Sequence, residues 1–266
     1  MLSYQHAYHA GNLADIHKHV ALAAALDYLT QKPKPVSYIE THAGRGLYDL
    51  SAAEALKTGE AASGIGWLLG SNLLPPQSLY ARTLRAIQDK FGRNAYAGSP
   101  LMAQTLLRPD DRLFLAELHP QEYDALAKLF AADKRVKTAK QDGLAYARGL
   151  LPPTPRRGLI LIDPSYEIKS EYEQIADFVL EAHKKWPVGV IMLWYPLLAA
   201  QRHEAMITKL ERAALPKALR HEVDFSARNN PRHGMRGSGL YIINTPFGLD
   251  PALGELERLY QLEPSP

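Results

Sequence analysis

A short, wholly apolar stretch, Leu159–Ile162, constrains the fold of this chain more than any other feature. Four consecutive apolar residues are typical of a strand that is buried on both faces, as in parallel sheets covered by helices. Pro164 follows almost at once and ends the strand, because proline has no backbone N–H to give to a ladder. The sequence therefore predicts an open α/β sheet with Asp163 at the carboxyl end of a central strand, where such sheets bind their ligands.

The residues that follow this strand, Asp163, Pro164, Ser165 and Tyr166, suit the binding of a flat heterocycle through its exocyclic amino group. The Asp163 carboxylate and the Pro164 carbonyl can each accept one N–H, and the Tyr166 ring can stack on the heterocycle. Two acceptors would also stabilise the positive charge that grows on the nitrogen during an attack. A strand end with a proline turn and a surface tyrosine is an equally good explanation of these four residues.

Strand patterns alternate with helical patterns along most of the chain. Seven strands are predicted, at Val36–Glu40, Arg112–Ala116, Arg135–Ala139, Leu159–Ile162, Val188–Trp194, Arg220–Phe225 and Gly239–Asn244. Pro196 is expected to end the fifth strand, and a helix is expected over 197–214. The last two strands have no helical crossover between them, so this pair is expected to be antiparallel.

Residues 48–96 interrupt the alternation, because they look helical and contain no clear strand. Just before them, the first strand runs into a turn with Gly44 and Gly46, a weak form of the glycine turn that opens nucleotide-binding folds. In such folds an acidic residue binds the ribose about 20 residues later. Glu117, at the end of the second strand, lies at this distance from the glycine turn only when residues 48–96 are left out of the count. We therefore predict a Rossmann-like domain over 1–47 and 97–266, with a helical insertion subdomain over 48–96.

Three polar residues are candidate helix caps. Asn12 precedes a predicted helix over 13–29, and Ser99 precedes another. Asp142 is placed either to cap the next helix or to bind the edge of an adenine. The segment 227–237 holds three Arg, one His and two Gly in eleven residues. It is interpreted as a phosphate-binding arm or, equally, as a solvated hairpin loop.

Composition excludes several functions. The chain of 266 residues has no cysteine, which rules out disulfides, thiolate metal sites and cysteine nucleophiles. Five histidines lie between His6 and His42 without the carboxylates or spacing of a zinc site, so no metal is expected. We find no apolar run that would serve as a signal peptide or membrane span, and we expect a cytoplasmic protein. The net charge of +3 permits a nucleic-acid partner without requiring one.

Taken together, these residues resemble the class I S-adenosylmethionine methyltransferases that act on amino groups. Their signature is an Asp/Asn-Pro-Pro-aromatic tetrapeptide after the fourth strand, and Ser165 departs from it at the second proline. A serine in place of this proline affects the stiffness of the turn that orients Tyr166. More narrowly, residues 1 to about 245 resemble the RlmJ family of bacterial 23S ribosomal RNA adenine-N6 methyltransferases. The matching stretches are MLSY, HAYHAGN, ETHAGRG, AGSPL, AELHP, QDG, RRGLILIDPSYE and LWYP.

The resemblance implies a seven-stranded Rossmann-like methyltransferase fold, S-adenosylmethionine as cofactor and 23S ribosomal RNA as partner. Separately from the resemblance, we expect a monomer. It implies Asp163 as the catalytic acceptor, with Pro164 and Tyr166 beside it, and Tyr4 in contact with the RNA. It also implies that the cofactor site is lined by Lys18, His19, His42, Ser99, Glu117, Asp142, Gly143 and Asp163.

Three alternatives remain open at this point. One is the same chemistry on DNA, at adenine N6 or cytosine N4, because both bases offer an exocyclic amine. The second is a non-catalytic nucleic-acid-binding protein on the same fold. The third, a nucleotide-dependent oxidoreductase, rests on the glycine turn alone and gives the residues Asp163 to Tyr166 no task.

Overall fold

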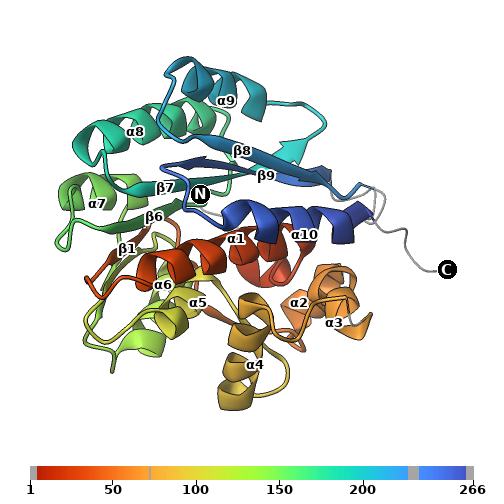
Figure 1. The fold of residues 1–266 in the computed structure, drawn as a ribbon. Coiled ribbons are helices and arrows are strands. Elements are labelled where there is room, and N and C mark those ends of the chain that lie inside the picture. The colour runs from red at the N-terminus through yellow and green to blue at the C-terminus, as the bar shows by residue number, and fades with distance from the viewer. Residues whose placement is uncertain (1–4, 72, 227–233, 262–266) are drawn as a thin grey trace.

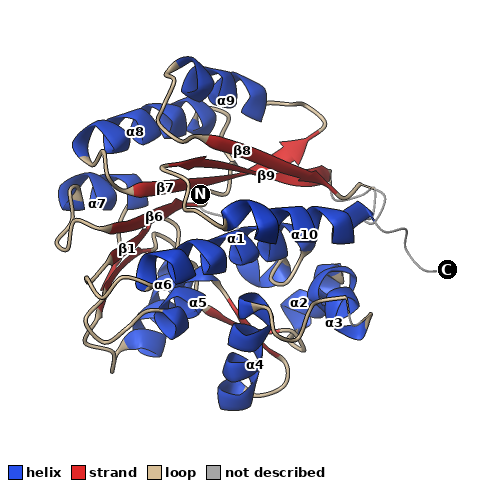
Figure 2. Cartoon of the chain, viewed as in Figure 1, coloured by secondary structure: helices blue, strands red, loops and turns tan. Residues whose placement is uncertain are grey.

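The computed structural model describes residues 5–71, 73–226 and 234–261 of the chain. Its main feature is a seven-stranded sheet with the order β5-β4-β1-β6-β7-β9-β8, covered by helices on both faces (Figure 1, Figure 2). All seven predicted strands are present, so the predicted sheet is confirmed. They are β1 (Ser37–Glu40), β4 (Arg112–Ala116), β5 (Val136–Ala139), β6 (Gly158–Ile162), β7 (Val190–Leu198), β8 (Leu219–Asp224) and β9 (Met235–Ile243).

The direction of the strands determines where a ligand can bind. The sheet is parallel from β5 to β7, whereas β9 runs antiparallel to both of its neighbours, as predicted for the last pair. β1 and β6 pair at the centre and are buried throughout, which the apolar pattern predicted. The strand order reverses between them, and open α/β sheets bind ligands at such a point. The carboxyl ends of β1 and β6 therefore meet where a site is expected.

The fifth strand is longer than expected. β7 continues through Pro196 to Leu198, so the prediction that Pro196 ends this strand is wrong. β6 pairs with β7 only as far as Leu193, and beyond it Pro196 has a partner strand on one side alone. A missing backbone N–H is tolerated at such a position. The helix expected over 197–214 consequently begins later, as α9 (His203–Arg212).

Two helical layers enclose the sheet, each with its own hydrophobic core. α7, α8 and α9 cover one face, and α1, α5, α6 and α10 cover the other (Figure 1). Their bounds are α1 (Leu13–Thr30), α5 (Ser99–Leu106), α6 (Pro120–Phe130), α7 (Gly143–Leu150), α8 (Glu171–Lys185) and α10 (Leu249–Gln261). Within the described residues, none of the helices is both long enough and apolar enough to cross a bilayer.

Helix α1 is buried over most of its length because α5 and α10 pack against it (Figure 1). Asn12 caps it as predicted, since its side chain accepts the Asp15 backbone N–H at 2.9 Å. Burial on all sides means that the polar residues of α1 are also enclosed, among them Asp15, His17, Lys18 and His19. Buried polar groups of this kind need partners, and their partners define the site described below.

The span 48–96 is mostly helical, as predicted, but its two ends lie in strands that the sequence did not indicate. β2 (Leu47–Asp49) and β3 (Ala95–Ala97) form an antiparallel pair. The helical elements between them are α2 (Ala53–Thr58), η2 (Ala62–Gly66), α3 (Trp67–Gly70) and α4 (Leu79–Phe91). Side chains from this span, including Ile65 and Leu84, belong to the same hydrophobic core as α1. The division into a domain and an inserted subdomain stays a prediction.

Candidate active site

A cavity of about 420 Å³ opens at the carboxyl ends of the parallel strands. It is lined by the turns that follow β1, β4, β5 and β6, by the end of β7, and by α1 and the short η1 (His6–Tyr8). The eight residues predicted to bind the cofactor all line it: Lys18, His19, His42, Ser99, Glu117, Asp142, Gly143 and Asp163. Pro164 and Tyr166 line it as well. Tyr4 and residues 227–233 of the proposed phosphate-binding arm lie outside the described residues.

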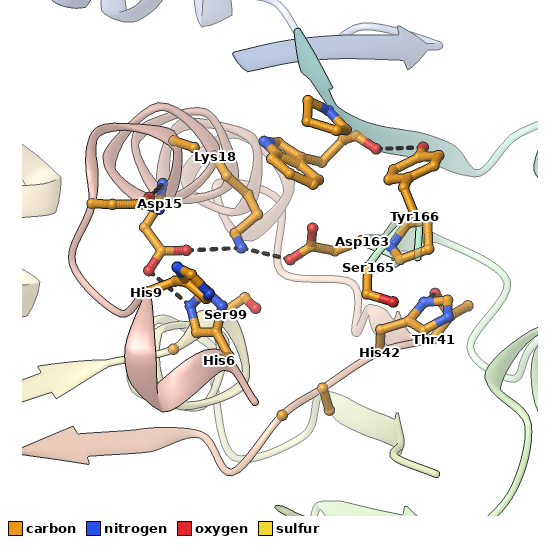
Figure 3. A pocket seen from close by; sticks show the side chains of 18 of the residues that line it. His6, His9, Asp15, Lys18, Thr41, His42, Ser99, Asp163, Ser165 and Tyr166 are labelled. Atoms are coloured by element: carbon orange, nitrogen blue, oxygen red, sulfur yellow. Dashed lines mark hydrogen bonds and ion pairs between the residues drawn. The ribbon is translucent and has the colours of Figure 1, made fainter. Parts of the chain in front are cut away.

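The Asp163 carboxylate faces the cavity in an ion pair. Asp163 follows β6 with 15% of its side chain exposed, and its Oδ2 lies 2.5 Å from the Lys18 ammonium (Figure 3). Lys18 also contacts Asp15 Oδ1 at 3.0 Å. Burial would lower the pKa of Lys18, but the Asp163 and Asp15 carboxylates raise it above its ordinary value. Lys18 is therefore a charged ammonium that fixes the position of the Asp163 carboxylate, whose second oxygen has no hydrogen-bond partner among the described residues.

Asp15 joins this group through its own contacts, and the sequence analysis gave it no role. Its Oδ2 lies 2.9 Å from His6 Nε2 and accepts the Gly11 backbone N–H at 2.9 Å. Burial would raise the pKa of Asp15, but His6 and Lys18 lower it well below its ordinary value. The first turn of α1 thus carries a buried carboxylate that keeps Lys18 charged. Only the fold reveals this role, because Asp15 and Asp163 are remote in sequence.

Tyr166 is buried, so the interpretation of this residue as a surface tyrosine is wrong. It is 6% exposed, its hydroxyl donates to the Trp194 carbonyl at 2.9 Å, and its ring packs on Tyr172 with centroids 4.4 Å apart. Its φ of +54° lies in the left-handed region, which is strained for an aromatic residue. The hydroxyl and ring contacts hold this turn in place although Ser165 replaces the usual second proline. That Tyr166 stacks on a substrate base stays a prediction.

Glu117 connects the glycine turn to the end of β4. Its carboxylate accepts the Gly44 backbone N–H at 2.8 Å and the His119 backbone N–H at 2.7 Å. Burial raises the pKa of Glu117 above its ordinary value. Each carboxylate oxygen has a further lone pair, so Glu117 can still accept hydroxyl groups of a ribose in the cavity.

Asp142 and Gly143 form the start of α7 next to the turn after β1. Asp142 accepts the Ala145 backbone N–H at 2.7 Å and so caps the helix, one of its two predicted tasks. A Cβ on Gly143 would lie 1.7 Å from the Thr41 carbonyl oxygen, so only glycine fits there. This close contact brings the N-terminal end of α7 to the cavity.

Ser99 does not cap α5, contrary to the prediction, because Gly98 is the capping residue. The Ser99 hydroxyl instead donates to Glu40, which also accepts the Tyr38 hydroxyl at 2.7 Å. Glu40 ends β1 and is fully buried, and burial raises its pKa to about 8. No sequence pattern singled out Glu40, although it stands directly before the glycine turn, where it supports the cavity through its contact with the lining residue Ser99.

The polar atoms of the cavity lining fit a cofactor with polar groups, such as S-adenosylmethionine. Two buried nitrogens of its lining, His19 Nε2 and His119 Nδ1, have no hydrogen-bond partner among the described residues. Burial lowers the pKa of His19 to about 3, so this ring is neutral, and its Nδ1 contacts the Tyr96 hydroxyl at 3.1 Å. Unpartnered buried nitrogens are costly, and a ligand with polar groups would satisfy them.

Metal ligation was not expected from the sequence. Among the described residues, one group of side chains has ligand atoms close enough for an ion: His203, Glu204 and Glu222. Arg220 donates to both of these carboxylates at 2.8 Å, so its guanidinium already balances negative charge that a metal ion would need.

The strand order, the antiparallel β9 and the cavity over the β1–β6 junction define a Rossmann-like methyltransferase fold. Residues 33–261 match the family model described as "Ribosomal RNA large subunit methyltransferase D, RlmJ". The chain belongs to this RlmJ family. The family assignment confirms the resemblance seen in the sequence and favours methyl transfer over the oxidoreductase alternative.

Relatives agree with this assignment. The chain is 39% identical over 251 residues to the ribosomal RNA large subunit methyltransferase J of Escherichia coli, covering 94% of this chain and 89% of that protein. It is also 39% identical to the protein of the same name from Haemophilus influenzae, over 96% and 92% of the two chains. A crystal structure of a Legionella pneumophila protein superposes with a TM-score of 0.84 at 38% identity, covering 94% and 92%.

Proposed function

We propose that this chain transfers a methyl group from S-adenosylmethionine to the exocyclic N6 of an adenine in 23S ribosomal RNA. The observation that carries the proposal is the position of the Asp163 carboxylate, held by Lys18 at 2.5 Å beside Pro164 at the edge of the cavity. A carboxylate and a neighbouring carbonyl can accept the two hydrogens of one amino group. The family and the names of its relatives support ribosomal RNA as the substrate.

An aromatic amine is a poor nucleophile, because its lone pair is delocalised into the ring. When bound, S-adenosylmethionine supplies a methyl group on a sulfonium, which is an activated leaving group. Asp163 and the Pro164 carbonyl would hold N6 and stabilise the positive charge that develops on it while the N–C bond forms and the C–S bond breaks. The Lys18 ion pair keeps the carboxylate in one orientation, so little reorganisation is needed during the attack.

The cofactor site follows from the remaining lining residues. Glu117 would accept ribose hydroxyls, and His19 and His42 would contact other polar groups of the cofactor. A target base inside a helix cannot reach Asp163, so the adenine must be unpaired or flipped out. The N-terminal residues and the helices of 48–96 would form walls of the RNA groove. We further propose that the protein acts as a monomer in the cytoplasm and needs no metal.

The Asp163→Ala variant tests the proposal. We expect it to lose methyl transfer to unmodified 23S ribosomal RNA, measured with methyl-labelled cofactor, while calorimetry finds cofactor binding largely retained. The matched control is Asp177→Ala, since Asp177 is an exposed residue of α8 whose carboxylate pairs with Lys209 on the surface. DNA of the same sequence is tested alongside. Transfer by Asp163→Ala above a few per cent of the wild-type rate would contradict the role of Asp163, and a preference for DNA would contradict the substrate.

A further inference from the structure

We propose that Ser238 and His17 are positioning residues that hold the Trp194 ring as a wall of the active-site cavity, through a one-way chain of hydrogen bonds. This inference rests on the proposed function, because it concerns the side of the cavity that would receive the target base. Trp194 lies in the LWYP stretch, to which the sequence analysis gave no chemical task. Its ring is partly exposed, lines the cavity, and has its centroid 5.8 Å from the Lys18 ammonium.

The chain of contacts runs from the cavity to the far side of α1. Trp194 Nε1 donates to Ser238 Oγ at 2.8 Å, and Ser238 Oγ lies 2.9 Å from His17 Nδ1. His17 Nε2 in turn lies 3.0 Å from His221 Nδ1, and His221 Nε2 lies 3.9 Å from a carboxylate oxygen of Glu257. Besides β7, two strands and two helices each contribute one residue to this series of contacts. The contacts therefore cross the core between β9, α1, β8 and α10.

The chemistry of the groups fixes the direction of this chain. An indole N–H can only donate, so Ser238 accepts from Trp194. Burial lowers the pKa of both His17 and His221, so each ring is neutral and carries one donor and one acceptor nitrogen. Ser238 is fully buried, and within the described part of the chain its hydroxyl hydrogen has no acceptor other than His17 Nδ1. His17 must then donate from Nε2 to His221, whose own N–H points toward Glu257.

In this series of hydrogen bonds, only this one arrangement gives every buried polar atom a partner. Reversing His17 would leave the Ser238 hydroxyl hydrogen buried without an acceptor, which is costly. Trp194 is also held at its main chain, where its carbonyl accepts the Tyr166 hydroxyl at 2.9 Å. Both its backbone and its ring are therefore fixed. Loss of the Ser238 hydroxyl would free the ring to rotate and would remove the wall beside the Lys18 ammonium.

The expected effect falls on the RNA substrate and spares the cofactor, because the turns after β1, β4 and β5 are not part of this chain of hydrogen bonds. For Ser238→Ala we expect the KM for unmodified 23S ribosomal RNA to rise about tenfold, the equivalent of one buried hydrogen bond. The Kd for S-adenosylmethionine should change less than about twofold. Both are measured at one pH, beside thermal unfolding of each variant.

A double-mutant cycle separates positioning from a structural role. Trp194→Phe keeps an aromatic ring and removes the indole N–H, so it should raise the KM for RNA by itself. Adding Ser238→Ala to Trp194→Phe should then change the KM by less than about twofold, because the bond is already absent. A Ser238→Ala effect of equal size in both backgrounds would mean that Ser238 acts only through the core, and would overturn the proposal.

A measurement on the wild-type protein tests the chain of hydrogen bonds independently of catalysis. The indole N–H of Trp194, assigned by its loss in Trp194→Phe, should exchange with D₂O far more slowly than a free indole in the NMR spectrum. Exchange as fast as that of free tryptophan would overturn the proposal even if Ser238→Ala does not fold. A wild-type protein that shows a protected indole but transfers no methyl group would contradict the proposed function and leave the hydrogen-bond chain intact.

Discussion

Replacing Lys18 by Met should show how much the buried ion pair contributes. Lys18 is 4% exposed and lies between Asp15 and Asp163 at 3.0 and 2.5 Å. Met retains the length of the side chain and removes the charge, which leaves two carboxylates facing each other. Breaking a buried pair by removing one partner costs about 3–5 kcal/mol. Because Asp163 is partly exposed to the cavity, we expect the lower end, about 3 kcal/mol of unfolding free energy.

Urea unfolding followed by fluorescence measures this cost, and Lys209→Met is the matched control. Lys209 makes a similarly short ion pair, 2.6 Å to Asp177, but Asp177 is exposed and Lys209 is partly exposed. An exposed pair contributes less than about 1 kcal/mol. Adding Asp15→Asn to Lys18→Met should recover part of the stability, because it removes the repulsion between the Asp15 and Asp163 carboxylates, although in Lys18→Met alone Asp15 still contacts His6 and Gly11. Equal losses for Lys18→Met and Lys209→Met would refute the reasoning that burial makes the Lys18 pair strong.

Two further predictions concern Glu40 and the start of α7. Burial raises the pKa of Glu40 from its ordinary value of about 4.5 to about 8. Between pH 4.5 and pH 8 the folded state therefore binds more protons than the unfolded state. The free energy of unfolding consequently falls as the pH rises through this window. The stability of wild type relative to Glu40→Gln should therefore decrease from pH 5 to pH 8 in urea titrations, and a constant or growing difference would contradict the assigned pKa. Gly143→Ala should weaken cofactor binding more than tenfold, because its Cβ would lie 1.7 Å from the Thr41 carbonyl oxygen. The control is Gly149→Ala in the same helix, where an added Cβ has no atom within 4 Å. It should leave the cofactor affinity measured by calorimetry unchanged and add up to about 1 kcal/mol of stability. Equal cofactor affinity of the two variants would contradict the role of the Gly143–Thr41 contact.

Much of the sheet was predictable because its signals are local. Apolar runs such as Leu159–Ile162 identify strands buried on both faces, and the caps Asn12 and Asp142 follow from residue type and position alone. β2 and β3 were not predictable, since strands of three residues are too short to show an alternating pattern.

The candidate site was predictable only in part. Position after a strand was enough to single out Asp163, Glu117 and Asp142, and the resemblance supplied five further lining residues, Lys18, His19, His42, Ser99 and Gly143. The Lys18–Asp163 ion pair joins a residue of α1 to the residue after β6, and no local pattern indicates it. The sequence left two interpretations of Tyr166 open for the same reason, because its burial depends on Tyr172 and Trp194, which lie on separate elements. Long-range packing decided each of these cases.

Identifying the product that the wild-type protein forms on unmodified 23S ribosomal RNA tests the proposed methyl transfer itself. The RNA is incubated with S-adenosylmethionine, digested and mapped by mass spectrometry. If Asp163 and the Pro164 carbonyl accept the hydrogens of one exocyclic amine, as proposed, the product is N6-methyladenosine at a defined position, and it is absent with Asp163→Ala. A methyl group found on a ribose, on a ring nitrogen or on no nucleotide at all would contradict it.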